Sequence, residues 1–309
     1  MKAARIHEFG DASVIRYEEV PRPVPGPGEV LIDVAAAAYN PSDAGFRAGV
    51  MQAVLPMELP YVPGAEVSGV VVEVGDGVGR FAVGDHVIGR LDTGAASAEY
   101  VATGADVLVR APVALPLSHA AALPIAALTA WQAVFEHARV RAGRRVLVNG
   151  AGGGVGGFAV QLAKHAGAYV IATAGARSAA AVRGYGADQI IDYTATPVLE
   201  AVAGQRFDVV LNLAPTSPQE TARLVDLVTD GAAFVSTTTP GPDDAGRGVR
   251  TVRVFARSDA TQLTELIARV DAGELKIEVA ERRPLTDLAA VHDEATAGRL
   301  AGKTVLTPA

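Results

Sequence analysis

The sequence predicts a two-domain α/β protein, and three observations support this prediction. The chain has 309 residues and 50% of them are hydrophobic, which is enough for two domains with buried cores. Residues 1 to about 120 form short valine-rich runs separated by glycine and proline, a pattern typical of a mostly β domain. From about residue 121, helical and strand patterns alternate, which indicates βαβ units in a doubly wound parallel sheet.

The first part of the chain is expected to contain short strands, in the manner of a partly open barrel. Residues 1–20 alternate polar and apolar residues without a long apolar core, so they predict a strand rather than a signal peptide. Valine-rich runs at 28–38, 66–90 and 98–112 predict further strands. The most apolar tract, 111–135, is interrupted by prolines and is rich in alanine, which predicts a buried helix and not a membrane span.

The alternating region is expected to end near residue 258, and a last mixed segment follows it. The expected strands cover residues 144–150, 169–174, 188–193, 208–214 and 232–238. The expected helices cover residues 126–140, 155–168, 176–187 and 218–231. The last segment predicts a helix at 261–275, a strand at 277–285, a helix at 288–299 and a strand at 303–308.

Composition argues against several classes of function. The formal net charge is -7 and no block of basic residues occurs, so nucleic acid is not an expected partner. The chain has no cysteine, which excludes disulfides, thiolate nucleophiles and every cysteine-containing zinc or iron–sulfur site. These features fit a cytoplasmic protein with no membrane partner.

A glycine cluster follows the strand expected at 144–150. Gly152, Gly154 and Gly157 satisfy the spacing GxGxxG, between a strand pattern and an amphipathic helix pattern. Glycines at such a turn let the backbone approach a pyrophosphate, and the helix N-terminus offers free amides and a partial positive charge. The alternative is a loop of small residues that only permits close packing of helix and strand.

The end of the next strand indicates which dinucleotide is bound. NAD-binding versions of this turn carry an acid about 20 residues beyond the glycines, whereas a basic residue suits the 2′-phosphate of NADP. Here the region 172–178 contains Arg177, and no carboxylate occurs before Asp188. We therefore expect NADPH, although Arg177 could instead be a solvated residue at the start of a helix.

The order of motifs resembles the zinc-independent quinone oxidoreductases of the medium-chain dehydrogenase/reductase superfamily. The motifs that carry the resemblance are GEVLIDVAAAAYNPSDAGFRAG, LPYVPGAEVSGVVVEVGDGVGRFAVGDHVIG, AAALPIAALTAWQAV, VLVNGAGGGVGGFAVQLAK, GADQIIDY and GKTVL. The resemblance implies a mostly β, GroES-like catalytic domain formed by residues 1–122 and 259–309. It also implies a Rossmann domain at 123–258 and an active site in the cleft.

The resemblance also indicates whether a catalytic zinc ion is to be expected. Family members with catalytic zinc carry cysteine where this sequence has Asn40, and a GHE motif where it has Gly64, Ala65 and Glu66. We therefore expect no zinc, and no flavin. Without a Lewis acid, alcohol dehydrogenation is disfavoured, and hydride transfer to a conjugated acceptor is expected instead. A quinone is the leading acceptor. The alternatives are an enoyl or 2-alkenal reductase, and a non-catalytic NADPH-binding protein that senses redox state.

The resemblance implies a set of site residues. An asparagine at Asn40 and a threonine at Thr129 would lie beside the nicotinamide, and Tyr193 would lie near the 2′-phosphate with Arg177 and Ser178. The hydroxyl candidates for assisting proton transfer are Tyr39, Ser42 and Tyr61, each with an alternative role in packing or in a turn. The residues expected to contact the cofactor are Asn40, Thr129, Ala151, Gly152, Gly154, Val155, Thr173, Arg177, Ser178, Tyr193, Leu213 and Thr237.

Some positions depart from the family pattern or have a structural interpretation. Several quinone reductases carry a tyrosine where this chain has Gly45, which puts one route for quinone contact in doubt. Asp43 and Glu66 are expected to serve structure through hydrogen bonds, and Lys303 is interpreted as a surface lysine. The resemblance also suggests a homodimer in which the edge strand near 249–255 extends the sheet across a two-fold axis.

Overall fold

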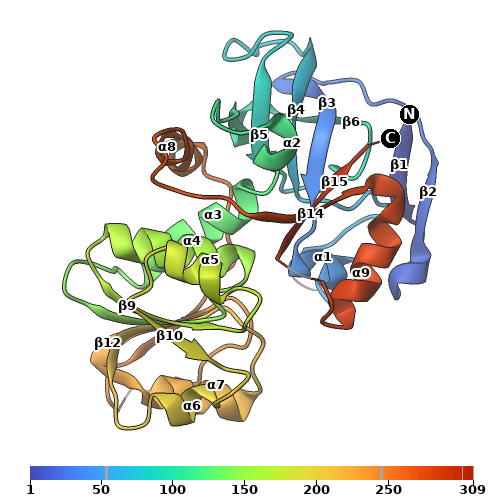
Figure 1. Cartoon of the computed structure of the whole chain (residues 1–309). Coiled ribbons are helices and arrows are strands. Elements are labelled where there is room, and N and C mark those ends of the chain that lie inside the picture. The colour runs from blue at the N-terminus through green and yellow to red at the C-terminus, as the bar shows by residue number, and fades with distance from the viewer. Residues whose placement is uncertain (53–54, 244–245, 301, 309) are drawn as a thin grey trace. The chain divides into compact units, whose positions relative to one another are not determined.

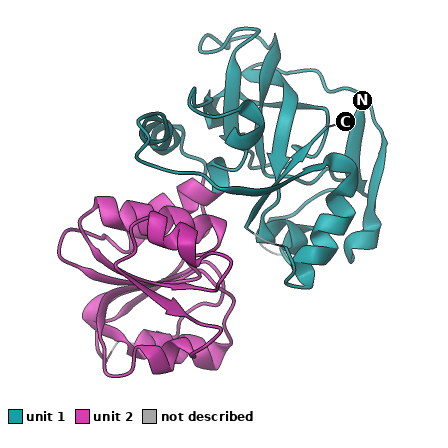
Figure 2. Cartoon of the chain, in the orientation of Figure 1, with its two compact units in different colours: residues 1–125, 258–309 teal, residues 126–257 magenta. Residues whose placement is uncertain are grey.

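The computed structural model describes residues 1–52, 55–243, 246–300 and 302–308. The chain divides into two compact units, coloured separately in Figure 2. Unit 1 contains residues 1–125 and 258–309, and unit 2 contains residues 126–257. The sequence predicts domain boundaries at 122/123 and 258/259, and the observed boundaries lie at 125/126 and 257/258.

Unit 1 is built on two β-sheets within the described residues. The larger sheet has seven strands in the order β14-β15-β3-β4-β5-β7, with β6 also pairing with β3, and the smaller is the antiparallel pair β1-β2. Strands β14 and β15 come from the C-terminal segment, and β15 pairs antiparallel with β3. The two ends of the chain therefore form one unit, as the GroES-like resemblance implied. The strands are β1 (Lys2–Ile6), β2 (Ile15–Glu19), β3 (Glu29–Ala38), β4 (Glu66–Val74), β5 (His86–Arg90), β6 (Tyr100–Gly104), β7 (Leu108–Arg110), β14 (Val279–Pro284) and β15 (Lys303–Thr307).

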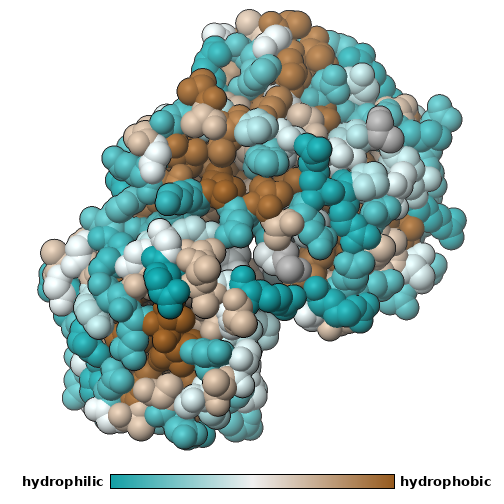
Figure 3. Space-filling model, viewed as in Figure 1, coloured by the Kyte–Doolittle hydropathy of each residue, from teal (hydrophilic) through white to brown (hydrophobic). Residues whose placement is uncertain are grey.

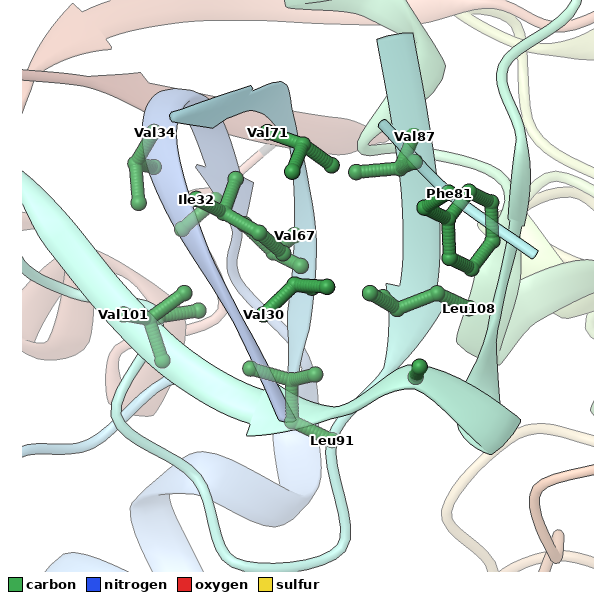
Figure 4. Packing of buried hydrophobic residues seen from close by; sticks show 13 residues of the cluster. Val30, Ile32, Val34, Val67, Val71, Phe81, Val87, Leu91, Val101 and Leu108 are labelled. Atoms are coloured by element: carbon green, nitrogen blue, oxygen red, sulfur yellow. The ribbon is translucent and has the colours of Figure 1, made fainter. Parts of the chain in front are cut away.

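The core of unit 1 explains why its valine-rich runs form strands. Alternate residues of a strand point to the same face, so Val30, Ile32 and Val34 of β3 lie on one face and pack together. Val67 and Val71 of β4 pack against the same face, as Figure 4 shows. Burial of such side chains contributes about 1.5–3 kcal/mol each relative to exposure.

Short helices complete unit 1. Helix α1 (Pro41–Arg47) follows β3 directly, and the Asp43 side chain near its start accepts a hydrogen bond from the Asn40 amide at 2.8 Å. This contact is the carboxylate half of a capping arrangement, which stabilises a helix start. The other helices are α2 (Leu117–Ala120), α8 (Ala260–Asp271) and α9 (Leu288–Thr296), with 3₁₀ turns η1 (Ala12–Val14), η2 (Ala105–Val107) and η4 (Leu285–Asp287).

Unit 2 contains a parallel sheet in the order β10-β9-β8-β11-β12-β13, which has six strands in the described part of the chain. From β8, the chain adds β9 and then β10 on one side of the sheet. It then crosses to the other side of β8 and adds β11, β12 and β13 there, so the direction of strand order reverses between β8 and β11. Ligands of doubly wound sheets bind beyond the carboxyl ends of the strands at this reversal. The strands are β8 (Arg145–Asn149), β9 (Tyr169–Ala174), β10 (Gln189–Asp192), β11 (Phe207–Asn212), β12 (Val228–Ser236) and β13 (Arg250–Arg253).

Helices cover both faces of this sheet. In Figure 1, α4 and α5 lie on one face, and α6 and α7 lie on the other. The prediction for α7 was wrong at its end: the helix stops at Asp226, and residues from Val228 belong to β12, where β-branched Val228 packs in the core. The helices are α4 (Gly154–His165), α5 (Ala179–Gly184), α6 (Val198–Ala201) and α7 (Pro218–Asp226).

The apolar tract at 111–135 is divided among several segments. Its prolines separate α2 from α3 (Pro124–Trp131), and α3 continues as the π-helical segment η3 (Gln132–His137). None of the described helices is long and apolar enough to cross a membrane. On the face shown in Figure 3, apolar residues are interspersed with hydrophilic ones.

Candidate functional site

The turn after β8 has strict steric requirements. Gly150 has a φ of +94°, and a Cβ at this position would lie 2.8 Å from the Ala214 backbone nitrogen. Gly156 lies in the first turns of α4, and a Cβ there would lie 2.1 Å from the Gly150 carbonyl oxygen. Neither residue was identified from the sequence, because the spacing GxGxxG was matched to Gly152, Gly154 and Gly157. The run of glycines from 150 to 157 was the available signal.

The N-terminus of α4 is open to an anion. The helix begins at Gly154 with Gly153 as its N-cap, no side chain caps it, and its first turn contains no acid. The first amides of a helix have no partner within the helix, so such an end can accept a phosphate. The expected residues Ala151, Gly152 and Val155 all lie at this turn, as does Gly154.

A buried polar network connects the carboxyl ends of the central strands. The Gly150 amide donates to Thr173 Oγ1 at 2.8 Å, and that hydroxyl donates to Asn149 Oδ1 at 3.0 Å. Asn149 Nδ2 donates to Asn212 Oδ1 at 2.8 Å. The Thr173 hydroxyl thus stabilises the glycine turn by accepting a hydrogen bond from the Gly150 amide. The backbone amides of two other expected residues extend the arrangement: Leu213 donates to Asn149 O at 2.8 Å and Thr237 donates to Asn212 O at 3.2 Å.

The end of β9 brings several predicted residues near the glycine turn. A Cβ at Gly152 would lie 2.3 Å from Ser178 Oγ, so Ser178 lies against this glycine. Tyr193 is 54% exposed, and its hydroxyl lies 3.4 Å from where a Cβ of Gly175 would be. Arg177 is exposed, and its guanidinium has no hydrogen bond or ion pair with any residue that the structure describes.

The first acid after Arg177 in the sequence, Asp188, already has hydrogen-bond partners within the protein. Asp188 accepts two hydrogen bonds from Lys164 Nζ, at 2.9 and 2.7 Å, and one from the Val170 amide at 2.7 Å. These contacts hold the pKa of Asp188 below its usual value against the effect of burial. Because its oxygens bind Lys164 and the backbone, Asp188 holds the edge of the sheet together.

Unit 1 contains a buried polar cluster where the family resemblance places metal ligands. Asn40 follows β3, Glu66 begins β4, and Lys303 begins β15, and all three are at most 7% exposed. Lys303 Nζ donates to Asn40 Oδ1 at 2.7 Å and to Tyr39 O at 3.2 Å, and it forms an ion pair with Glu66 Oε1. The interpretation of Lys303 as a surface lysine was wrong, because the buried carboxylate of Glu66 on β4, two strands away in the sheet, pairs with it.

Both carboxylate oxygens of Glu66 accept hydrogen bonds. Its Oε1 accepts from Asn40 Nδ2 at 2.8 Å as well as from Lys303, and its Oε2 accepts from the Ile125 amide at 2.7 Å. Breaking a buried ion pair by removing one partner costs about 3–5 kcal/mol. Glu66 therefore has the structural role through hydrogen bonds that the sequence analysis expected of it.

Burial changes the acidity of the side chains around the cluster. Burial raises the pKa of Asp43 to about 7, with a further increase from Glu66, while the Asn40 amide and the Lys303 ammonium oppose this shift. Burial also raises the pKa of Tyr39 and of Tyr61 to about 12, with Asp43 adding to both shifts. Both phenols keep their protons at neutral pH and are weak proton sources.

The hydroxyl candidates have different surroundings. Tyr39 is 6% exposed, and its ring makes an edge contact with His292 at 4.9 Å between centroids. Ser42 is exposed on α1, and Tyr61 is half-buried. Gly45 lies inside α1, and a Cβ there would make ordinary contacts with Met51 Cγ at 3.5 Å and Val50 Cγ2 at 3.7 Å. Thr129 is buried in α3, within unit 2.

The residues at the position where zinc-dependent family members hold their metal do not suit a zinc ion. Asn40 Oδ1 and Glu66 Oε1 already bind the Lys303 ammonium, whose charge would repel a second cation. Zinc sites use cysteine, histidine or carboxylate ligands, usually three or four. In residues 1–52, 55–243, 246–300 and 302–308, no three such side chains are grouped to hold a metal.

The fold and the glycine turn together define the class of the protein. A GroES-like unit from both ends of the chain, with a Rossmann unit in the middle of the sequence, is the architecture of the medium-chain dehydrogenase/reductase superfamily. Family comparisons agree with this assignment. Residues 26–121 match the alcohol dehydrogenase GroES-like domain, and residues 185–306 match the family described as zinc-binding dehydrogenase.

Individual relatives identify the family within this superfamily. The chain is 31% identical to a chloroplast envelope quinone oxidoreductase homolog of Arabidopsis thaliana, over 100% of this chain and 98% of that protein. It is also similar to the Escherichia coli quinone oxidoreductase complexed with NADPH (TM-score 0.89, 25% identity, 100% of both chains). The CurK enoyl reductase matches with a TM-score of 0.87 and 26% identity, over 100% of this chain and 99% of that one. The chain belongs to the quinone oxidoreductase family of the medium-chain dehydrogenase/reductase superfamily.

Proposed function

We propose that this oxidoreductase uses NADPH to reduce quinones without a metal. The observation that carries the proposal is the Lys303 ammonium, which pairs with Asn40 and Glu66 where relatives with catalytic zinc hold their metal. Without a Lewis acid, a simple ketone or alcohol is a poor substrate. A quinone delocalises the incoming charge onto its own oxygen, so hydrogen-bond donors and water suffice as stabilisers.

The cofactor proposal rests on unit 2. The uncapped N-terminus of α4 suits the pyrophosphate, because its amides and partial positive charge face an anion. Arg177, Ser178 and Tyr193 suit the 2′-phosphate, since Arg177 is exposed and unpaired among the described residues. When bound, NADPH supplies a hydride from its nicotinamide ring. The E. coli relative bound to NADPH supports this choice.

The proposed roles within the chain divide between the units. In unit 2, Ala151, Gly152, Gly154 and Val155 cradle the pyrophosphate, while Leu213, Thr237 and Thr129 line the path toward the nicotinamide. In unit 1, Asn40 orients the ring, and a hydroxyl of Tyr39, Ser42 or Tyr61 assists proton transfer. The phenols act as hydrogen-bond donors rather than acids, because their pKa values lie near 12. A cytoplasmic location stays a prediction.

An enone is the second candidate acceptor, favoured by the similarity to the CurK enoyl reductase. Steady-state assays with NADPH against matched quinone and enone panels distinguish the two. We expect turnover with quinones. Turnover with enones alone would exclude the quinone proposal, and tight NADPH binding without turnover of either class would favour a redox-sensing protein.

Arg177→Ala tests the choice of cofactor. We expect NADPH binding to weaken on the order of 10- to 100-fold, because a charge-assisted hydrogen bond contributes about 1.5–3 kcal/mol. NADH lacks the 2′-phosphate, so its binding should hardly change. Arg183→Ala, at an exposed arginine of α5 in the same unit, is the matched control. An equal loss for NADPH and NADH would contradict the assignment.

We also propose a homodimer formed through β13. Among the described residues, this strand pairs only with β12, so it forms an edge of the sheet. Exposed strand edges in proteins are commonly protected by pairing, and a two-fold axis would join two copies of β13. Light scattering tests the proposal, and a monomeric mass would contradict it.

A further inference from the structure

The chemistry of its neighbours fixes the orientation of the Asn40 side chain. A lysine ammonium can only donate hydrogen bonds, so the Asn40 atom at 2.7 Å from Lys303 Nζ must be the carbonyl oxygen. A carboxylate only accepts, so the atom at 2.8 Å from Glu66 Oε1 must be the amide nitrogen. The charges of its two partners therefore fix which end of the Asn40 carboxamide faces Lys303 and which faces Glu66.

The hydrogen-bonding capacity of Asn40 is nearly exhausted. Its Nδ2 has two protons, one donated to Glu66 Oε1 and the other directed at Ala38 O at 3.3 Å. Its Oδ1 has two lone pairs, and Lys303 uses one of them. Among the residues that the structure describes, no other donor forms a hydrogen bond with Oδ1, which leaves one acceptor position for a ligand and no donor position.

We propose that Lys303 is a positioning residue, which holds the Asn40 carboxamide so that its one open group is an acceptor. The inference rests on the proposed function and deepens it. Asn40 then binds a ligand N–H or O–H and does not polarise a quinone carbonyl. Two groups of the reaction offer such a donor: the carboxamide of the nicotinamide ring and the hydroxyl of a reduced quinone.

A purely structural role for Lys303 is the competing explanation. Lys303, Asn40 and Glu66 lie on or beside β15, β3 and β4, which are neighbours in the sheet, so the ion pair could simply join these strands. The two explanations differ in one respect. If Lys303 acts through Asn40, its loss has no kinetic effect once the Asn40 carboxamide is absent, whereas a structural role persists in either background.

A double-mutant cycle on kcat/KM with NADPH and a quinone separates the explanations. The variants are Lys303→Met, Asn40→Ala and their combination. Asn40→Ala keeps the pair between Lys303 and Glu66 intact. We expect Lys303→Met to reduce kcat/KM on the order of 10²-fold in the wild-type background, as loss of orientation does. In the Asn40→Ala background we expect less than about threefold. Equal losses in both backgrounds would overturn the proposal.

Two controls keep the experiment decisive. Lys2→Met removes a partly exposed lysine of unit 1 and should leave kcat/KM unchanged. If Lys303→Met does not fold because Glu66 is left unpaired, Glu66→Gln is added to the two variants that carry Lys303→Met, so that no variant contains an unpaired buried charge. The same two outcomes then decide.

A cofactor analogue distinguishes the two donors. The acetylpyridine analogue of NADPH lacks the carboxamide N–H. If Asn40 binds the carboxamide, Asn40→Ala weakens binding of NADPH about tenfold and of the analogue hardly at all. If Asn40 binds the hydroxyl of the reduced quinone, Asn40→Ala weakens binding of the hydroquinone product instead. If Asn40→Ala weakens the binding of neither NADPH nor the hydroquinone product, the proposal is overturned. These titrations need no turnover, so they also apply if the wild type reduces no quinone, which would refute the proposed function alone.

Discussion

Asp43 should make the stability of this protein depend on pH in an unusual direction. Burial raises the pKa of its carboxyl from 3.8 to about 7 in the folded chain. The folded state therefore retains a proton that the unfolded state has lost between these two values. An acid with a raised pKa stabilises the folded state at low pH, and this contribution disappears as the pH rises toward 7.

The size of the effect follows from the linkage relation. Each pH unit within the window contributes about 1.4 kcal/mol for one proton, so the contribution of Asp43 falls by about 3 kcal/mol between pH 5 and pH 8. The carboxamide introduced by Asp43→Asn cannot titrate, yet its oxygen can still accept from the Asn40 amide, as the Asp43 carboxylate does at 2.8 Å. Comparison with this variant cancels the titration of all other groups.

Urea unfolding of both proteins at pH 5 and pH 8 provides the measurement. We expect the free energy of unfolding of the wild type, relative to Asp43→Asn, to be about 3 kcal/mol lower at pH 8 than at pH 5. The same difference at both pH values would show that the folded-state pKa of Asp43 is not raised and would refute the account of the cluster.

Two further predictions concern packing and a buried histidine. Gly156→Ala should destabilise the protein by about 1–3 kcal/mol and weaken NADPH binding, because the new Cβ would lie 2.1 Å from Gly150 O. Gly184→Ala in α5, with nothing within 4 Å of the added Cβ, is the control, and an equal effect of both would contradict the prediction. Burial, aided by Arg47, lowers the pKa of His292 from 6.5 to about 4, so its contribution to stability should be lost as pH falls through that window. His292→Gln should remove at most about 3 kcal/mol of this acid sensitivity in urea titrations, and an unchanged pH profile would count against it.

Much of the fold could be predicted because its signals are local. The alternation of valine in β3 and β4 identified the strands of unit 1, and the strand and helix patterns around Gly152 identified the Rossmann unit. The end of α7 was misplaced because LVTDG fits both a helix and a strand, and pairing of β12 with β11 decided in favour of the strand.

The site was only partly accessible from the sequence. Residues close together in the chain, such as Ala151 and Gly154, could be assigned to one turn from spacing alone. Gly150 and Gly156 were missed because their need for glycine comes from close approach to Ala214 and to each other, which spacing does not show.

The sequence by itself determined the two-unit architecture, the position of the glycine turn and the absence of cysteine and of an acid beside Arg177, because these depend on residue type and short spacing. Tertiary structure decided the role of Lys303. Its partners Glu66 and Asn40 lie 237 and 263 residues away in sequence, and only the pairing of β15 with β3 and of β3 with β4 brings them together. A charged side chain at the first residue of a strand is ordinarily solvated, and burial beside a carboxylate is what makes this one part of the site.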